Sequence, residues 1–156
     1  MYKKYLGVSV IGIFLSLQAN LALSSIDDLA KTAEKMSTCA ATFIVAQSAG
    51  LVQGKEMEDE LKRRVTQMGL LSTYLVKIQD NNLTPSEAAV KTQQWLTKQI
   101  DIYRAIKKLQ GSEVMLGELT NQIQECSAEF PVADTMSPLM YEDPEFVNYI
   151  NELPKT

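Results

Sequence analysis

The chain has 156 residues, with 15 basic and 19 acidic side chains, two cysteines and no histidine. The lack of histidine excludes Ser-His and Cys-His nucleophile pairs and removes the residue on which most zinc and haem sites depend. The net charge of −4 argues against nucleic acid as a partner, because binding to phosphates requires clustered Lys and Arg. The length is that of one domain that can bury a core.

The first 24 residues have the layout of a secretory signal peptide. Lys3 and Lys4 precede an apolar run over 6–17, and small residues follow at Ala22 and Ser24. This run is shorter than the roughly 20 apolar residues that a membrane span requires. We therefore predict export and cleavage after Ser24, or alternatively after Ala22, with no stable membrane anchoring afterwards.

Removal of this leader makes the remaining protein more acidic. The leader carries two of the fifteen basic residues and none of the nineteen acidic ones, so the other 132 residues have a formal net charge of −6. Such a protein is a poor ligand for anionic membrane surfaces. We expect a bacterial source and a periplasmic or secreted location.

Four segments of the mature chain place apolar residues at intervals of three and four, which is the pattern of amphipathic helices. The predicted helices cover about 26–51, 55–80, 85–110 and 113–130. The third has the clearest start, since Thr-Pro-Ser-Glu at 84–87 supplies a cap, a proline at the first helical position and a glutamate at the third. Short connections between such helices favour an all-α fold, an antiparallel four-helix bundle over 25–130.

The composition changes at residue 131, because four of the five prolines lie in the last 26 residues. We expect an irregular tail over 131–156 with room for only a short fifth helix. The tail either packs on the bundle as a lid or projects from it as a binding arm. Its three aromatic residues lie among acids, a mixture suited to a protein contact, and are Tyr141, Phe146 and Tyr149.

The two cysteines lie on the apolar stripes of the first and fourth predicted helices, at Cys39 and Cys126. These helices are neighbours in an up-down-up-down bundle, and an exported protein meets an oxidising compartment. We therefore predict a disulfide, with two buried free thiols as the alternative. The absence of Cys-x-x-Cys argues against a catalytic redox pair, and two cysteines without histidine are too few for a closed zinc site. We expect no metal and no cofactor.

No catalytic constellation is visible in the sequence, which favours a non-enzymatic protein. The first hypothesis is an exported helical protein that binds another exported protein, as an inhibitor, an immunity factor or an assembly helper. The alternative is a small apolar ligand held in the core beside Trp95 and Tyr103, which needs a pocket of roughly 300 Å³ or more. A carboxylate-dependent enzyme is the third hypothesis. The oligomeric state and the identity of the partner are left open.

Overall fold

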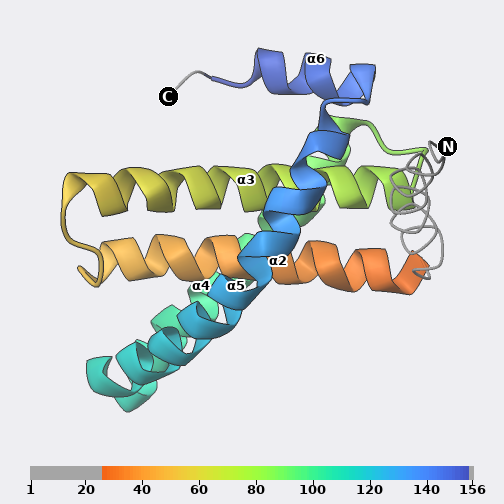
Figure 1. The fold of residues 1–156 in the computed structure, drawn as a ribbon. Helices are drawn as coiled ribbons and strands as arrows, with labels where there is room; N and C mark the ends of the chain where they lie inside the picture. Colours follow the sequence, from red (N-terminus) through yellow and green to blue (C-terminus); the bar gives the residue numbers. More distant parts are fainter. Residues whose placement is uncertain (1–25, 155–156) are drawn as a thin grey trace, which may run out of the picture.

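The structure, a computed structural model, describes residues 26–154, and the predicted signal peptide at 1–24 lies outside them. The described part of the chain is helical and contains no strand, which confirms the all-α class (Figure 1). Its helices are α2 (Ile26–Ser48), α3 (Lys55–Gln79), α4 (Pro85–Gln110), α5 (Ser112–Met140) and α6 (Pro144–Glu152).

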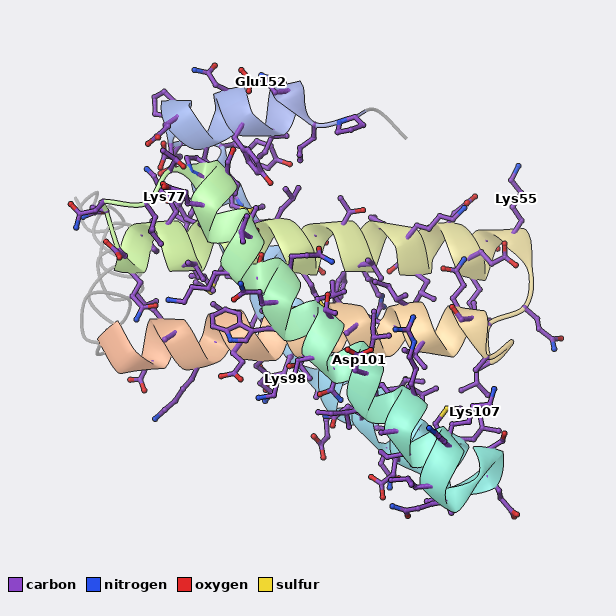
Figure 2. The ribbon with its side chains drawn as sticks, turned by 180° about the vertical axis from the view of Figure 1, so that it is seen from behind. Lys55, Lys77, Lys98, Asp101, Lys107 and Glu152 are labelled. Carbon is purple, nitrogen blue, oxygen red and sulfur yellow. A yellow bond between two sulfur atoms is a disulfide. The ribbon has the colours of Figure 1, made fainter. Side chains whose placement is uncertain are left out.

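The four long helices form two antiparallel hairpins that cross each other. The α2 and α3 helices lie side by side, while α4 and α5 run diagonally across opposite faces of that pair (Figures 1 and 2). The chain turns between α4 and α5 at Gly111, whose φ of 94° lies in the region that favours glycine. The α2–α3 pair is therefore held between the two arms of the second hairpin.

The main core contains buried side chains from all five helices. Its largest fully buried members include Met36, Met68, Leu71, Leu75, Met140 and Phe146. A second, smaller cluster lies near the α4–α5 turn and contains Ala46, Tyr103, Met115 and Leu119. Packing of this kind is the main source of stability for helices of this length.

Buried hydroxyl groups fix how the helices sit on one another. The Ser37 hydroxyl donates to the carbonyl of Thr92 at 2.7 Å, which joins α2 to α4. The Ser72 hydroxyl donates to the carbonyl of Ala33 at 2.6 Å, and the hydroxyls of Thr73 and Thr92 lie 3.1 Å apart. Within the described residues, every buried side-chain nitrogen or oxygen has a hydrogen-bond partner. A shift of α4 along the α2–α3 hairpin would break the Ser37–Thr92 and Thr73–Thr92 bonds. Each unpaired buried group costs about 1–3 kcal/mol.

The last long helix does not end at residue 130, as its prolines suggested. It continues to Met140 through Pro131 and Pro138. Both prolines are exposed, so water reaches the carbonyl groups that lose their N–H donors. Phe130 and Met140, in contrast, are buried in the core. Packing thus outweighs a proline penalty of about 3 kcal/mol, and the predicted irregular chain over 131–140 is wrong.

The short fifth helix expected in the tail is confirmed as α6. Asp143 caps it, since its carboxylate accepts hydrogen bonds from the N–H groups of Glu145 and Phe146 at 3.0 and 3.2 Å. Pro144 occupies the first helical position, where no N–H donor is needed. The helix lies against the rest of the fold beside the start of α4 (Figure 1).

Candidate functional site

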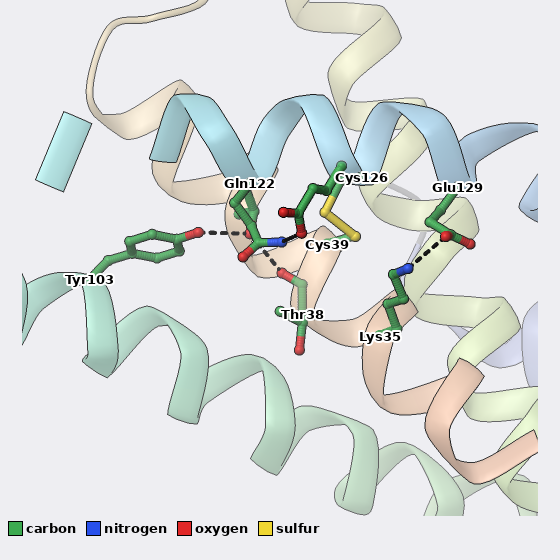
Figure 3. The surroundings of a disulfide bond; sticks show 9 residues. Lys35, Thr38, Cys39, Tyr103, Gln122, Cys126 and Glu129 are labelled. Atoms are coloured by element: carbon green, nitrogen blue, oxygen red, sulfur yellow. Dashed lines mark hydrogen bonds and ion pairs between the residues drawn. A yellow bond between two sulfur atoms is a disulfide. The ribbon is translucent and has the colours of Figure 1, made fainter. Parts of the chain in front are cut away.

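Cys39 and Cys126 lie at disulfide-bonding distance, with their sulfur atoms 2.05 Å apart. Both are buried, and each lies near the middle of its helix, where α5 crosses α2 (Figure 3). An ion pair between Lys35 and Glu129 joins the same two helices close by. Because obliquely crossing helices approach each other closely at only one place, the cysteine pair fixes the point at which α5 crosses α2.

A second contact between α5 and its neighbours is aromatic and charged. The guanidinium groups of Arg64 and Arg63 lie 4.1 and 5.0 Å from the centre of the Phe130 ring. Both arginines also donate hydrogen bonds to Glu60, at 2.9 Å from Arg63 Nε and 2.8 Å from Arg64 Nε. These hydrogen bonds lower the pKa of Glu60 to about 2. This cluster holds α3 against α5 and keeps the Glu60 carboxylate ionised.

The aromatic residues of the tail have different surroundings. Phe146 is fully buried, with its ring centre 5.1 Å from that of Tyr74 and 5.5 Å from that of Tyr149. Phe146 anchors α6 to the bundle and is not available to a partner. The sequence-based expectation that it contacts a partner protein is therefore corrected. Tyr149 is partly buried in the same group, and Tyr141 is exposed. The tail therefore packs on the bundle as a lid.

An ion-pair cluster accompanies this aromatic anchor. Lys77 Nζ lies 2.7 Å from Asp143 Oδ2 and 3.1 Å from Glu145 Oε2. The side chains of Lys77 and Asp143 are largely buried. The hydrogen bond from Lys77 lowers the pKa of Asp143 and raises the pKa of Lys77. The chain thus docks an acidic segment by burying an aromatic ring and placing the flanking carboxylates on a lysine.

Trp95 and Tyr103 do not line one common pocket. Trp95 packs against the main core, whereas Tyr103 belongs to the second cluster, where its hydroxyl lies 3.1 Å from that of Thr42. Tyr103 lines a groove of about 240 Å³ between α2, α4 and α5. A groove of about 230 Å³ lies among α2, α3, α4 and α6. Both volumes are below the 300–1,000 Å³ that is typical of small-molecule sites.

The solvent side of α4 carries exposed apolar side chains. Val90 is 61% exposed, Ile102 41% and Leu109 79%. Ile102 and Leu109 are seven residues apart and so share one flank of the helix. We name the solvent-facing side of α4 from Val90 to Leu109 the α4 outer face. Lys98, Asp101 and Lys107 project from it in Figure 2.

The α4 helix is also basic, although the chain as a whole is acidic. It contains five basic residues against two acidic ones, whereas α5 contains five acidic residues and no basic one. Because these helices cover opposite faces of the α2–α3 pair, the molecule is electrically polarised. Among residues 26–154, the one ion pair within α4 joins Arg104 to Asp101 at 3.0 Å, and no acidic group lies within 4 Å of the Lys98 or Lys107 ammonium.

The carboxyl groups with shifted pKa values are held in hydrogen bonds and ion pairs that support the fold. A carboxylic acid that donates a proton near neutral pH needs a raised pKa. Hydrogen bonds from Thr84 instead lower the pKa of Glu87, as hydrogen bonds from cations do for Glu60 and Asp143. In the described part of the chain, no three His, Cys, Asp or Glu side chains gather as a metal site. None of the helices from α2 to α6 has the length and apolar character to cross a membrane.

No protein-family model, curated protein or solved structure matches this chain. The function must therefore be argued from the residues. The sequence did not predict the α4 outer face, because helical periodicity placed Leu109, and either Ile102 or Tyr103, on the apolar stripe of this helix. The structure buries Tyr103 but leaves Ile102 and Leu109 exposed, so the placement of Leu109 on the buried stripe is wrong. The excess of basic residues in this helix, in contrast, was visible in the sequence.

Proposed function

We propose that this chain is an exported, non-enzymatic helical protein that binds another exported protein through the α4 outer face. The observation that carries the proposal is the combination of exposed Val90, Ile102 and Leu109 with basic residues on one helix. Protein interfaces combine apolar side chains at the centre with charged groups at the rim. Exposed apolar side chains that share one flank of a helix, as Ile102 and Leu109 do, are a feature of surfaces that contact another molecule.

The proposal of export has two supports. The residues at 1–24 follow the pattern of a signal peptide. Cys39 and Cys126, at bonding distance in the core, are compatible with an oxidising location such as the periplasm or the extracellular space, where disulfides persist. N-terminal sequencing of the purified mature protein tests this part, with Ser25 as the expected first residue and Met1 as the contradicting one.

The charge of the α4 outer face restricts the partner. Lys98 and Lys107 have no ion-pair partner among residues 26–154, so an acidic surface brought against them gains attraction without breaking an existing pair. Complementary charge also speeds association and excludes wrong partners. The partner is therefore a protein with an acidic contact surface.

Site-specific photo-crosslinking in the producing cell tests the binding surface. A photoreactive amino acid replaces Ile102 on α4 or, as a control, Val132 on α5, residues with nearly equal exposure at 41% and 40%. The expected result is one discrete crosslinked protein at position 102 and a much weaker product at position 132. Equal products at both positions, or none at position 102, would contradict the proposal.

A further inference from the structure

A groove lies on one flank of the α4 outer face, between the second halves of α2 and α4. Its volume is about 240 Å³, and its apolar lining includes Ile44, Val45, Ile100 and Met115. Tyr103 also lines it, and the Tyr103 hydroxyl is already within hydrogen-bond distance of Thr42. The groove therefore offers mainly apolar contact, because the polar end of this tyrosine is satisfied inside the protein.

Two cations lie at the edge of this groove. Arg104 and Lys107, from the last three turns of α4, are both among its lining residues. Lys107 has no ion-pair partner within the described residues. Arg104 pairs with Asp101, but both side chains are well exposed, and pairs of this kind contribute little free energy. Both cations can therefore meet an incoming carboxylate.

The volume and the lining together limit the occupant. The groove is smaller than the usual site for a small molecule, and suits one large apolar side chain. In protein interfaces, such anchors fill pockets near the centre and supply much of the binding free energy. The cations at the edge favour acidic residues on either side of that anchor.

The protein itself contains an occupant of this chemistry. In α6, Phe146 is fully buried while Asp143 and Glu145 lie 2.7 and 3.1 Å from Lys77. An aromatic anchor with acidic neighbours thus docks beside a lysine within this fold. The groove beside Lys107 offers the same combination, an apolar recess next to a lysine, to a segment of the partner protein.

We propose that the groove lined by Ile100, Tyr103 and Met115 receives one aromatic side chain from an acidic segment of the partner protein, with flanking carboxylates on Arg104 and Lys107. This inference rests on the proposed function and identifies the chemistry of the partner segment. It also predicts that the groove contributes specificity, since only a segment with both features satisfies it.

Methyl NMR of the mature protein tests the proposal with a defined probe. The probe is a synthetic peptide with the sequence of residues 143–149, Asp-Pro-Glu-Phe-Val-Asn-Tyr, and its control carries Ala in place of both Phe and Tyr. We expect the methyl signals of Ile100 and Met115 to shift on titration, with at least tenfold weaker binding for the control peptide. The Arg104→Glu/Lys107→Glu variant should lose the shifts. The Lys55→Glu/Lys62→Glu variant on α3, which changes the net charge equally and lies outside the α4 outer face, should keep them.

Several outcomes would overturn the groove assignment. These are unmoved Ile100 and Met115 signals, equal affinity for the two peptides, or shifts confined to the surroundings of Phe146, which would mean that the probe displaces α6. Shifts produced by decanoate but not by the peptide would assign the groove to a lipid carboxylate instead. If the peptide does not bind while crosslinking at position 102 persists, the groove assignment is wrong but the α4 outer face remains the binding surface. If crosslinking fails as well, the proposed function falls with it.

Discussion

Removal of the cysteine pair should lower the stability of this protein by a calculable amount. Cys39 and Cys126 are separated by 87 positions, and a crosslink across a loop of that size stabilises the folded state by about 4.6 kcal/mol in the chain-entropy model. In a domain of this length, 1 kcal/mol corresponds to a change in Tm of about 3–4 °C. The Cys39→Ala/Cys126→Ala variant should therefore melt about 15 °C lower than the oxidised protein.

Thermal melts followed by circular dichroism provide the measurement. The oxidised protein, the reduced protein and the double variant are compared, because reduction removes the crosslink without changing any side chain. The helix content of all three should agree at low temperature, since the crosslink acts mainly on the unfolded chain. A decrease of less than about 5 °C in both reduced and variant protein, or two reactive thiols in unfolded, unreduced protein, would refute the reasoning.

Three further changes have definite expected results. Phe146→Ala removes the anchor of α6, at a cost of up to about 3–5 kcal/mol, so hydrogen exchange of α6 should become fast while the other helices stay protected. Because the pKa of Glu60 is lowered to about 2, its contribution to stability is complete above its unfolded pKa of about 4.5 and is lost as the pH falls towards 2. Urea unfolding at a series of pH values should show a smaller loss over this window for Glu60→Gln. Gly111→Ala places a Cβ at a φ of 94° and should cost about 1–2 kcal/mol in the same assay, whereas Gly117→Ala, within the regular part of α5, should not destabilise the protein.

Local sequence signals predicted the parts of the fold that depend on neighbouring residues. The capping pattern at 84–87 appears as expected, since Thr84 Oγ1 accepts from the Glu87 N–H at 3.3 Å and Glu87 Oε2 accepts from the Thr84 N–H at 2.8 Å. The predicted end of the fourth long helix was wrong. Pro131 and Pro138 favour a helix end locally, but the helix continues because Phe130 and Met140 pack against residues that are distant in the sequence.

The oblique crossing of the hairpins was not predictable either, because it depends on pairs that are distant in the sequence. The bond between Ser37 and Thr92 spans 55 positions, and the Cys39–Cys126 pair spans 87. Helix periodicity shows which residues are buried but not the angle at which two faces meet. The disulfide pairing was nevertheless predictable, since only two cysteines are present and both lie on buried stripes.

The candidate site shows the same limit. An aromatic residue flanked by acidic residues looks the same in the sequence whether it anchors its own helix or contacts another protein. The role of Phe146 could therefore not be decided from the sequence. The α4 outer face depends on which side of α4 the other helices cover. The five basic residues of α4 are visible in the sequence. That this helix lies opposite the acidic α5 helix could be known only from the arrangement of the two hairpins.

The size of the native protein in extracts of its compartment tests the central claim most directly. Size-exclusion chromatography should recover wild-type protein in a complex larger than the monomer. The Lys98→Glu/Ile102→Glu variant on the α4 outer face should elute as a monomer, while the control Glu125→Lys/Val132→Glu variant, which also places charges of altered sign on an exposed helix, should stay in the complex. Retention of the complex by the α4 variant, with loss in the α5 variant, would contradict the assignment of α4 as the binding surface.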